Sequence, residues 1–135
     1  MEYDSMMPVY LQVAAAVKHD IVTGKRRLGE KLPSVRDLAV EYTINPNTVG
    51  RVYRELEQDG LCFTRRGMGT FVTEDSRRLE QLRREMAQEL LDSFLSGMAK
   101  LGIPGRDAAR MAAEQAERAE RQKTEQEEKE HNAGM

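Results

Sequence analysis

Two helix-start signals lie only eleven residues apart, and this spacing constrains the fold more than any other feature of the chain. Ser34 suits an N-cap, and Asp37 stands where the reciprocal member of a capping box would be. Asn45 and Pro46 combine an N-cap residue with a proline at the first helical position. The first of these helices therefore has little more than two turns before the second begins. Two such helices joined by a tight turn form a helix-turn-helix.

Apolar spacing supports these two helices and predicts another one before them. In each helix the apolar residues recur three and four positions apart, as on one buried face. The earlier helix is expected over 8–23, from Pro8 at its first position to Gly24 just after its end, and a basic connector over 25–31 follows. The predicted buried positions are Tyr10, Val13, Ala14, Val17 and Ile21 in the first helix, Val35, Leu38, Ala39 and Tyr42 in the second, and Val49, Val52, Tyr53 and Leu56 in the third.

The residue pattern changes after Gly60. Residues 61–65 and 70–73 are rich in β-forming side chains, and 66–69 between them have the composition of a turn. A hairpin of this length is not stable alone, so it must pack against the preceding helices. Residues 1–74 are therefore expected to form a winged helix-turn-helix domain, in which the hairpin is the wing.

The remainder of the chain is predicted to be helical. One helix is expected over 75–101 and a second from about 106, after a break at 102–105. Together, residues 75–120 would form a two-helix region. Nothing apolar recurs in 121–135, so a polar tail that is frayed or disordered is expected there. The predicted fold class is mainly α with a small β-hairpin.

The helix over 75–101 carries an apolar stripe that is too wide for a lone helix in water. Each fully buried leucine stabilises a structure by roughly 1.5–3 kcal/mol, so an uncovered stripe favours association. The last helix covers it only weakly with a seam of alanines, so a second copy of the chain is the simplest partner. A small-molecule effector between the last two helices is a further partner that the sequence leaves open. The predicted dimer interface contains Leu79, Leu82, Met86, Leu90, Leu91, Phe94 and Met98.

Composition narrows the classes of function. The net charge is −2, and residues 1–73 carry 10 Lys and Arg against 9 Asp and Glu, so bulk charge does not indicate a nucleic-acid partner. The chain has one cysteine and shows no ligand cluster, nucleophile–base pair or phosphate loop, which argues against an enzyme, a metal site or a cofactor. It shows neither a membrane span nor a secretory signal, so a cytoplasmic protein is expected.

The predicted third helix nevertheless leaves a polar face that suits DNA. Its outward positions include Asn47, Arg51 and Arg54, whose side chains pair with adenine, guanine or phosphate. The hairpin turn adds Arg65 and Arg66 beside glycines that allow close backbone approach. These groups favour a recognition helix in the major groove and a wing on the backbone or in the minor groove. A winged helix that packs against another protein is the alternative, which an apolar outward face would favour.

Three segments in order resemble one family of regulators. They are LPSVRDLA at 32–39, NPNTV at 45–49 followed by YRELE at 53–57, and RRGMGTFV at 65–72. The segments are similar to the second helix, the recognition helix and the wing of GntR-type winged helix-turn-helix regulators. The short helical region that follows is similar to that of the YtrA subfamily.

The resemblance implies a dimeric bacterial transcription factor, usually a repressor, that binds double-stranded DNA at a palindromic operator. Gly50 departs from the pattern, because many members outside this subfamily have an arginine there that contacts guanine. Direct base readout is therefore expected to be thinner, and Arg51 is expected to contact phosphate. The expected DNA-binding residues are Ser34, Arg36, Asn45, Asn47, Thr48, Arg51, Arg54, Arg65, Arg66, Gly67 and Gly69.

Overall fold

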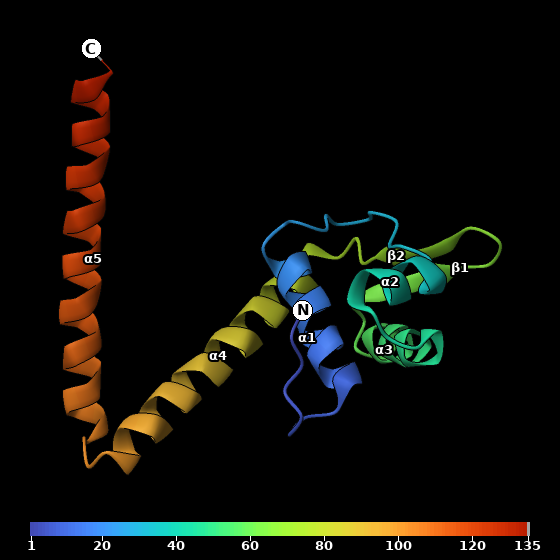
Figure 1. Ribbon diagram of the computed structural model, residues 1–135, viewed down its shortest axis with the longest axis horizontal. Helices are drawn as coiled ribbons and strands as arrows, with labels where there is room; N and C mark the ends of the chain where they lie inside the picture. The colour runs from blue at the N-terminus through green and yellow to red at the C-terminus, as the bar shows by residue number, and fades with distance from the viewer. Residues whose placement is uncertain (135) are drawn as a thin grey trace. The chain divides into compact units, whose positions relative to one another are not determined.

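The computed structural model describes residues 1–134 and confirms a mainly α fold with a small hairpin (Figure 1). The elements in chain order are α1 (Val9–Val22), α2 (Val35–Tyr42), α3 (Pro46–Gln58), β1 (Cys62–Arg65), β2 (Gly69–Val72), α4 (Ser76–Lys100) and α5 (Gly105–Ala133). The chain divides into two compact units, residues 1–86 and the residues from 87 on. Unit 1 contains α1 to β2 with the first turns of α4, and unit 2 contains the rest of α4 with α5.

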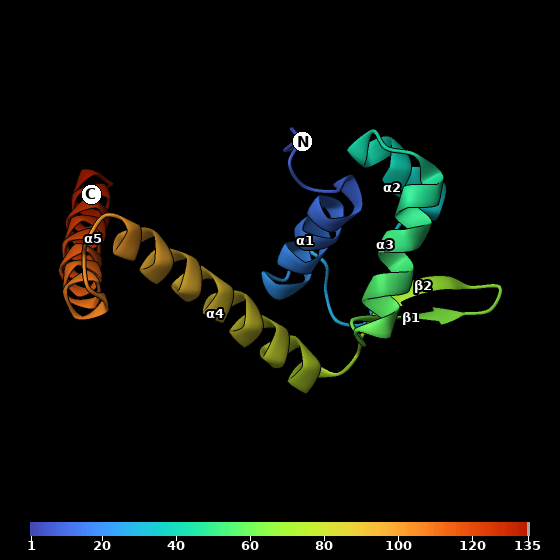
Figure 2. The same cartoon turned by 90° about the horizontal axis from the view of Figure 1, so that it is seen from below.

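The core of unit 1 lies where α1 and α2 pack on α3, with β1 against the end of α3 (Figure 2). The predicted apolar faces supply this core, since Val17 of α1, Leu38 of α2 and Leu56 of α3 are completely buried. Val35 is an exception at 37% exposed, because it lies in the first turn of α2. Tyr10 and Tyr42 are half-buried and pack against the edge of the core. The periodicity thus identified the buried faces of all three helices.

The two expected N-caps are present and place the turn of the helix-turn-helix. Ser34 Oγ accepts a hydrogen bond from the Asp37 N–H at 3.1 Å, but among the described residues the return bond of a capping box is not made. Asn45 Oδ1 accepts a hydrogen bond from the Asn47 N–H at 2.8 Å. Between the caps, Thr43 ends α2 in the left-handed region at φ 54° and ψ 53°. This conformation costs a residue other than glycine about 1–3 kcal/mol, and it turns the chain sharply into α3.

The hairpin pairs with a residue outside its two strands, and the sequence pattern did not predict this bridge. β1 and β2 pair antiparallel with Arg65 opposite Gly69, and Gly67 takes φ 76° in the turn between them. Lys31 forms an isolated antiparallel bridge with Phe71 on the other edge of β2. The Leu32 N–H also donates to the Thr70 carbonyl at 2.8 Å. The end of the basic connector therefore ties the wing to the start of α2.

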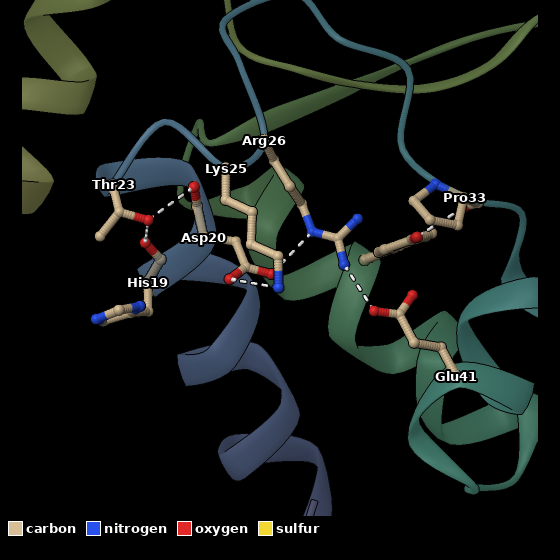
Figure 3. Close-up of polar contacts among 8 residues, drawn as sticks. His19, Asp20, Thr23, Lys25, Arg26, Pro33 and Glu41 are labelled. Carbon is tan, nitrogen blue, oxygen red and sulfur yellow. Dashed lines mark hydrogen bonds and ion pairs between the residues drawn. The ribbon is translucent and has the colours of Figure 1, made fainter.

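A partly buried ion-pair network fixes the segment between α1 and α2 (Figure 3). Arg26 Nε lies 3.2 Å from Asp20 Oδ2 of α1, and Arg26 Nη2 lies 3.3 Å from Glu41 Oε1 of α2. The Arg26 and Asp20 side chains are only 11% and 12% exposed, so solvent screens their attraction less than it would at the surface. Beside them the Tyr53 hydroxyl of α3 donates to the Pro33 carbonyl at 2.6 Å. The segment between α1 and α2 is thus held to all three helices, through Arg26 and Pro33.

The first turns of α4 belong to unit 1, and three residues of the predicted dimer interface lie in this part of the helix. Leu82 is 3% exposed and lies in the core of unit 1, while Leu79 and Met86 pack against that core. The Arg83 guanidinium donates to the Val22 carbonyl at 3.2 Å, and the Arg78 guanidinium donates to the carbonyl of residue 59 at 2.8 Å. The first part of the apolar stripe of α4 is therefore buried against unit 1, and the rest of the stripe lies in unit 2. The expected boundary at 74 lies inside unit 1, which continues to residue 86.

The predicted tail is part of α5. The helix runs without a break from Gly105 to Ala133, and residue 135 lies outside the described part of the chain. Residues 121–133 are mostly Glu, Gln, Lys and Arg, which have high helix propensity, and no glycine interrupts them before Gly134. The expected tail from 121 is therefore helical through Ala133, because helix propensity continues where the apolar pattern stops. Over residues 1–134 no helix is both long and apolar enough to cross a membrane.

Candidate nucleic-acid interface

The outward face of α3 is a strip of long polar side chains. Val49, Val52, Tyr53 and Leu56 face the core, which leaves Asn47, Arg51, Arg54 and Gln58 exposed and Thr48 half-buried. Arg54 extends back along this strip, because its Nη1 lies 3.6 Å from the point where a Cβ on Gly50 would be. The guanidinium of Arg54 thus lies beside the space that a side chain at residue 50 would occupy.

Contacts to neighbouring elements identify the two flanks of this strip. On one flank the Arg51 guanidinium lies over the Tyr10 ring of α1, with Cζ 3.6 Å from the ring centroid. On the other flank Glu57 accepts a hydrogen bond from the Thr64 N–H of β1 at 3.3 Å. Asn47 and Arg54 lie between these contacts, so they form the centre of the strip.

The polar residues at the helix starts have partly used their hydrogen-bonding capacity. The oxygens of Ser34 and Asn45 each accept one backbone N–H bond as caps, and their hydroxyl and amide hydrogens are left to donate to another group. Arg36, in the first turn of α2, is exposed. Ser34 and Asn45 therefore serve the fold first, whereas Arg36 makes no ion pair within residues 1–134.

The wing presents its basic residues on a stacked aromatic base. Phe63 and Phe71 stack across the two strands with ring centroids 5.6 Å apart, and the Arg65 guanidinium lies 5.4 Å from the Phe63 ring. Arg66 and Gly67 are exposed at the turn. The wing thus holds one arginine against a ring and leaves the other free at the tip.

Lys31 is a basic residue at the base of the wing that was not among the expected DNA-binding residues. Its side chain passes over Gly69, where an added Cβ would lie 2.9 Å from Lys31 Cε, and Gly69 itself has φ 118°. Both observations explain why a glycine stands at this position. The sequence carries no signal for the position of Lys31, because this residue is placed by a single bridge to Phe71 and a single bridge has no periodic pattern.

The ion pairs distinguish this surface from the rest of unit 1. Within residues 1–134 no ion pair involves Lys31, Arg36, Arg51, Arg54, Arg65 or Arg66. By contrast, carboxylates pair with three basic residues toward and just after the C-terminal end of α1, namely Lys18, Lys25 and Arg26. Although the net charge is −2, the basic side chains around α2, α3 and the wing are therefore left without an ion pair in the described part of the chain.

Cys62 does not contribute reactive chemistry to this surface. Its thiol is buried, and burial raises its pKa to about 12, so it stays protonated. The thiol lies 3.7 Å from the Tyr53 carbonyl, its one hydrogen-bond acceptor in the described chain. Cys62 therefore acts as a small core residue behind the wing.

Comparison with known proteins decides the family. The model of a family described as bacterial regulatory proteins, gntR family, matches residues 9–72, which is the span from α1 through β2. The chain is 38% identical over 102 residues to the uncharacterized HTH-type transcriptional regulator YhcF of Bacillus subtilis, covering 76% of this chain and 84% of that protein. The chain belongs to the GntR family. This GntR-family protein is also 34% identical over 100 residues to the HTH-type transcriptional repressor YtrA of the same bacterium, covering 70% of this chain and 77% of the repressor.

Solved structures agree with this assignment. A GntR-family transcriptional regulator from Listeria monocytogenes superposes with a TM-score of 0.77 at 40% identity, covering 83% of this chain and 98% of that one. YtrA from Sulfolobus acidocaldarius, a GntR-family transcription factor, gives a TM-score of 0.52 at 29% identity, over 66% of this chain and 93% of that one. The protein is thus a DNA-binding transcriptional regulator. The predicted family resemblance is confirmed, as is the expectation that it is not an enzyme.

Proposed function

We propose that this GntR-family regulator is a homodimeric repressor that binds a palindromic operator. The observation that carries the proposal is the exposed row of an amide and two arginines on α3 beside a basic wing, arginines that make no ion pair within residues 1–134. A recognition helix with these groups fits the major groove, where amide and guanidinium groups contact base edges. The wing would contact the backbone or the adjacent minor groove.

The position of each side chain on the strip supports a different role. Asn47 and Arg54 form the centre of the strip, so we assign them to base edges. Thr48 and Arg51 lie toward the α1 flank and suit phosphate contacts, as was expected from the sequence for Arg51. The proposed supporting contacts to the backbone come from Ser34, Arg36, Asn45, Arg65, Arg66, Gly67 and Gly69.

The protein-interaction alternative is not favoured by this surface. An interface with another protein would place apolar or aromatic side chains on the outward face of α3. That face instead carries Asn47, Arg51, Arg54 and Gln58, and the apolar residues of α3 are buried. Desolvating several unpaired guanidinium groups against a protein would be costly unless that partner supplied carboxylates for each.

Unit 2 supports dimerisation because it leaves large apolar side chains uncovered. Leu90 is 73% exposed, Leu91 53% and Leu95 40%. Alanines of α5 help to line a groove of the same unit, whose apolar lining is Phe94, Met98, Met111, Ala112, Ala116 and Ala119 and whose polar lining is Glu114, Gln115 and Arg118. A second copy of unit 2 would cover both features, and the two-fold axis of that dimer would match the symmetry of a palindromic site. Of the predicted interface, Leu90, Leu91, Phe94 and Met98 therefore stay in the proposal.

Selection of bound fragments from random duplex DNA tests the proposal. A dimer with two recognition helices should enrich an inverted repeat whose half-sites are centred about one helical turn, roughly 10 base pairs, or a multiple of it apart. The selected site, placed downstream of a promoter in a reporter, should then reduce transcription when the protein is present. Enrichment of a single half-site, or of no sequence, contradicts the dimeric operator.

As the DNA it would control lies in the bacterial cytoplasm, we propose that the protein works there.

A further inference from the structure

The contact between Arg51 and Tyr10 joins the recognition helix to the start of α1. Tyr10 is the second residue of α1, and Arg51 is in the second turn of α3. The Arg51 Cζ lies 3.6 Å from the centroid of the Tyr10 ring, well inside the distance of about 6 Å at which a guanidinium is attracted to an aromatic face. The ring is half-buried and packs on the core, so it offers a fixed surface to a mobile side chain.

We propose that Tyr10 is a positioning residue that holds the Arg51 guanidinium ready for a DNA phosphate, an inference that rests on the proposed function. The ring covers one face of the guanidinium, which leaves the N–H donors at the edges of the same plane available. Within residues 1–134 Arg51 makes neither a hydrogen bond nor an ion pair, so these donors have no competing acceptor. The planar fork of a guanidinium matches two oxygens of one phosphate.

The flank on which Arg51 is held favours phosphate over a base edge. Asn47 and Arg54 occupy the centre of the strip that faces the groove, whereas the contact with Tyr10 draws Arg51 toward α1. When a helix lies in the major groove, its centre faces the bases and its flanks face the two phosphate backbones. A guanidinium fixed at the α1 flank is therefore aimed at the backbone.

Fixing the side chain in advance increases affinity even though the protein makes the same interactions with DNA. A free surface arginine loses rotamer freedom when it binds, and this loss opposes association. An arginine that already rests on a ring loses less of that freedom. From the strength of exposed cation–π contacts, removal of the ring should weaken DNA binding about two- to fivefold.

The test is a double-mutant cycle of Tyr10→Leu and Arg51→Ala in the full chain. Binding to a duplex of random sequence is measured by fluorescence anisotropy at several salt concentrations. Tyr10→Leu should weaken binding about two- to fivefold with no change in salt slope, because the charge of Arg51 is still present. Arg51→Ala should weaken it and reduce the slope by about 0.9 for each phosphate that is no longer neutralised. In the Arg51→Ala background, Tyr10→Leu should have no further effect.

Tyr10→Phe is the matched control, because it keeps the ring and removes only the hydroxyl. It should bind DNA as the wild type does. Equal losses from Tyr10→Leu with and without Arg51 would overturn the positioning role, since a structural defect or a direct contact appears in both backgrounds. Binding by Tyr10→Phe that is as weak as that of Tyr10→Leu would overturn it too, because the hydroxyl itself would then be the group that binds DNA. Wild-type protein that binds no duplex would instead refute the proposed function.

Discussion

Removal of both wing arginines tests the proposed DNA interface through its electrostatics. Arg65 and Arg66 are exposed beside the hairpin turn, and neither forms an ion pair within residues 1–134. Each phosphate that a guanidinium neutralises contributes about 0.9 to the slope of log affinity against log salt concentration. The double variant Arg65→Ala, Arg66→Ala should therefore reduce that slope by about 1.8 for each wing bound.

The size of the effect on affinity follows from this slope. Between 50 and 200 mM salt, one unit of slope corresponds to about a fourfold change in affinity. When the salt concentration rises from 50 to 200 mM, the affinity of the wild type should thus fall by a factor that is about twelve times larger, for each wing bound, than the factor for the double variant. Fluorescence anisotropy with a duplex of random sequence measures both proteins. The loss should be the same on a selected operator, because phosphate contacts are independent of sequence.

A charge-matched control separates wing contacts from the effect of net charge. Arg106→Ala with Arg121→Ala removes the same two charges from α5, where both side chains are also exposed. This control should keep the wild-type slope at every salt concentration. An unchanged slope in the wing variant, or an equal change in both variants, would refute the inference that Arg65 and Arg66 contact the backbone.

Three further predictions concern base readout, the core and the dimer. Asn47→Ala should cost about 1–3 kcal/mol on a selected operator and little on random duplex in binding titrations, whereas equal losses on both would contradict a role at base edges. Leu82→Asp should destabilise unit 1 by about 3–5 kcal/mol in thermal or urea unfolding, because it leaves a carboxylate in a site that is 3% exposed. A variant that is monomeric and as stable as the wild type would instead place Leu82 in a dimer interface. Leu91→Glu should give monomers by light scattering while Ser93→Glu, which adds the same charge at another exposed position of α4, stays dimeric; dimers in both would move the interface elsewhere.

The features that the sequence predicted correctly depend on short-range rules. The caps at Ser34 and Asn45 act within three residues, so the start of α2 and of α3 could be placed without a structure. The buried face of α3 follows from apolar residues three and four positions apart. The position of the exposed polar strip on α3 follows from the same pattern, because the residues opposite a buried face must point outward.

The features that were missed or misplaced depend on contacts between distant parts of the chain. Lys31 pairs with β2 across about forty residues, and such a single bridge has no local signature. Tyr10 was expected only in the core, since periodicity assigns a face but not the partner that lies on it. The helical state of 121–133 is a different case, because it follows from local helix propensity and not from a distant contact.

Helix starts, buried faces and the family were thus determined by the sequence itself, because each is encoded in residues that lie close together in the chain. The tertiary structure decided how the stripe of α4 is shared. One apolar pattern runs through the whole helix, yet Leu82 is buried in the core of unit 1 while Leu90 is 73% exposed. A stripe shows that side chains will be buried but not against which partner, because apolar attraction has no direction and any apolar surface within reach satisfies it.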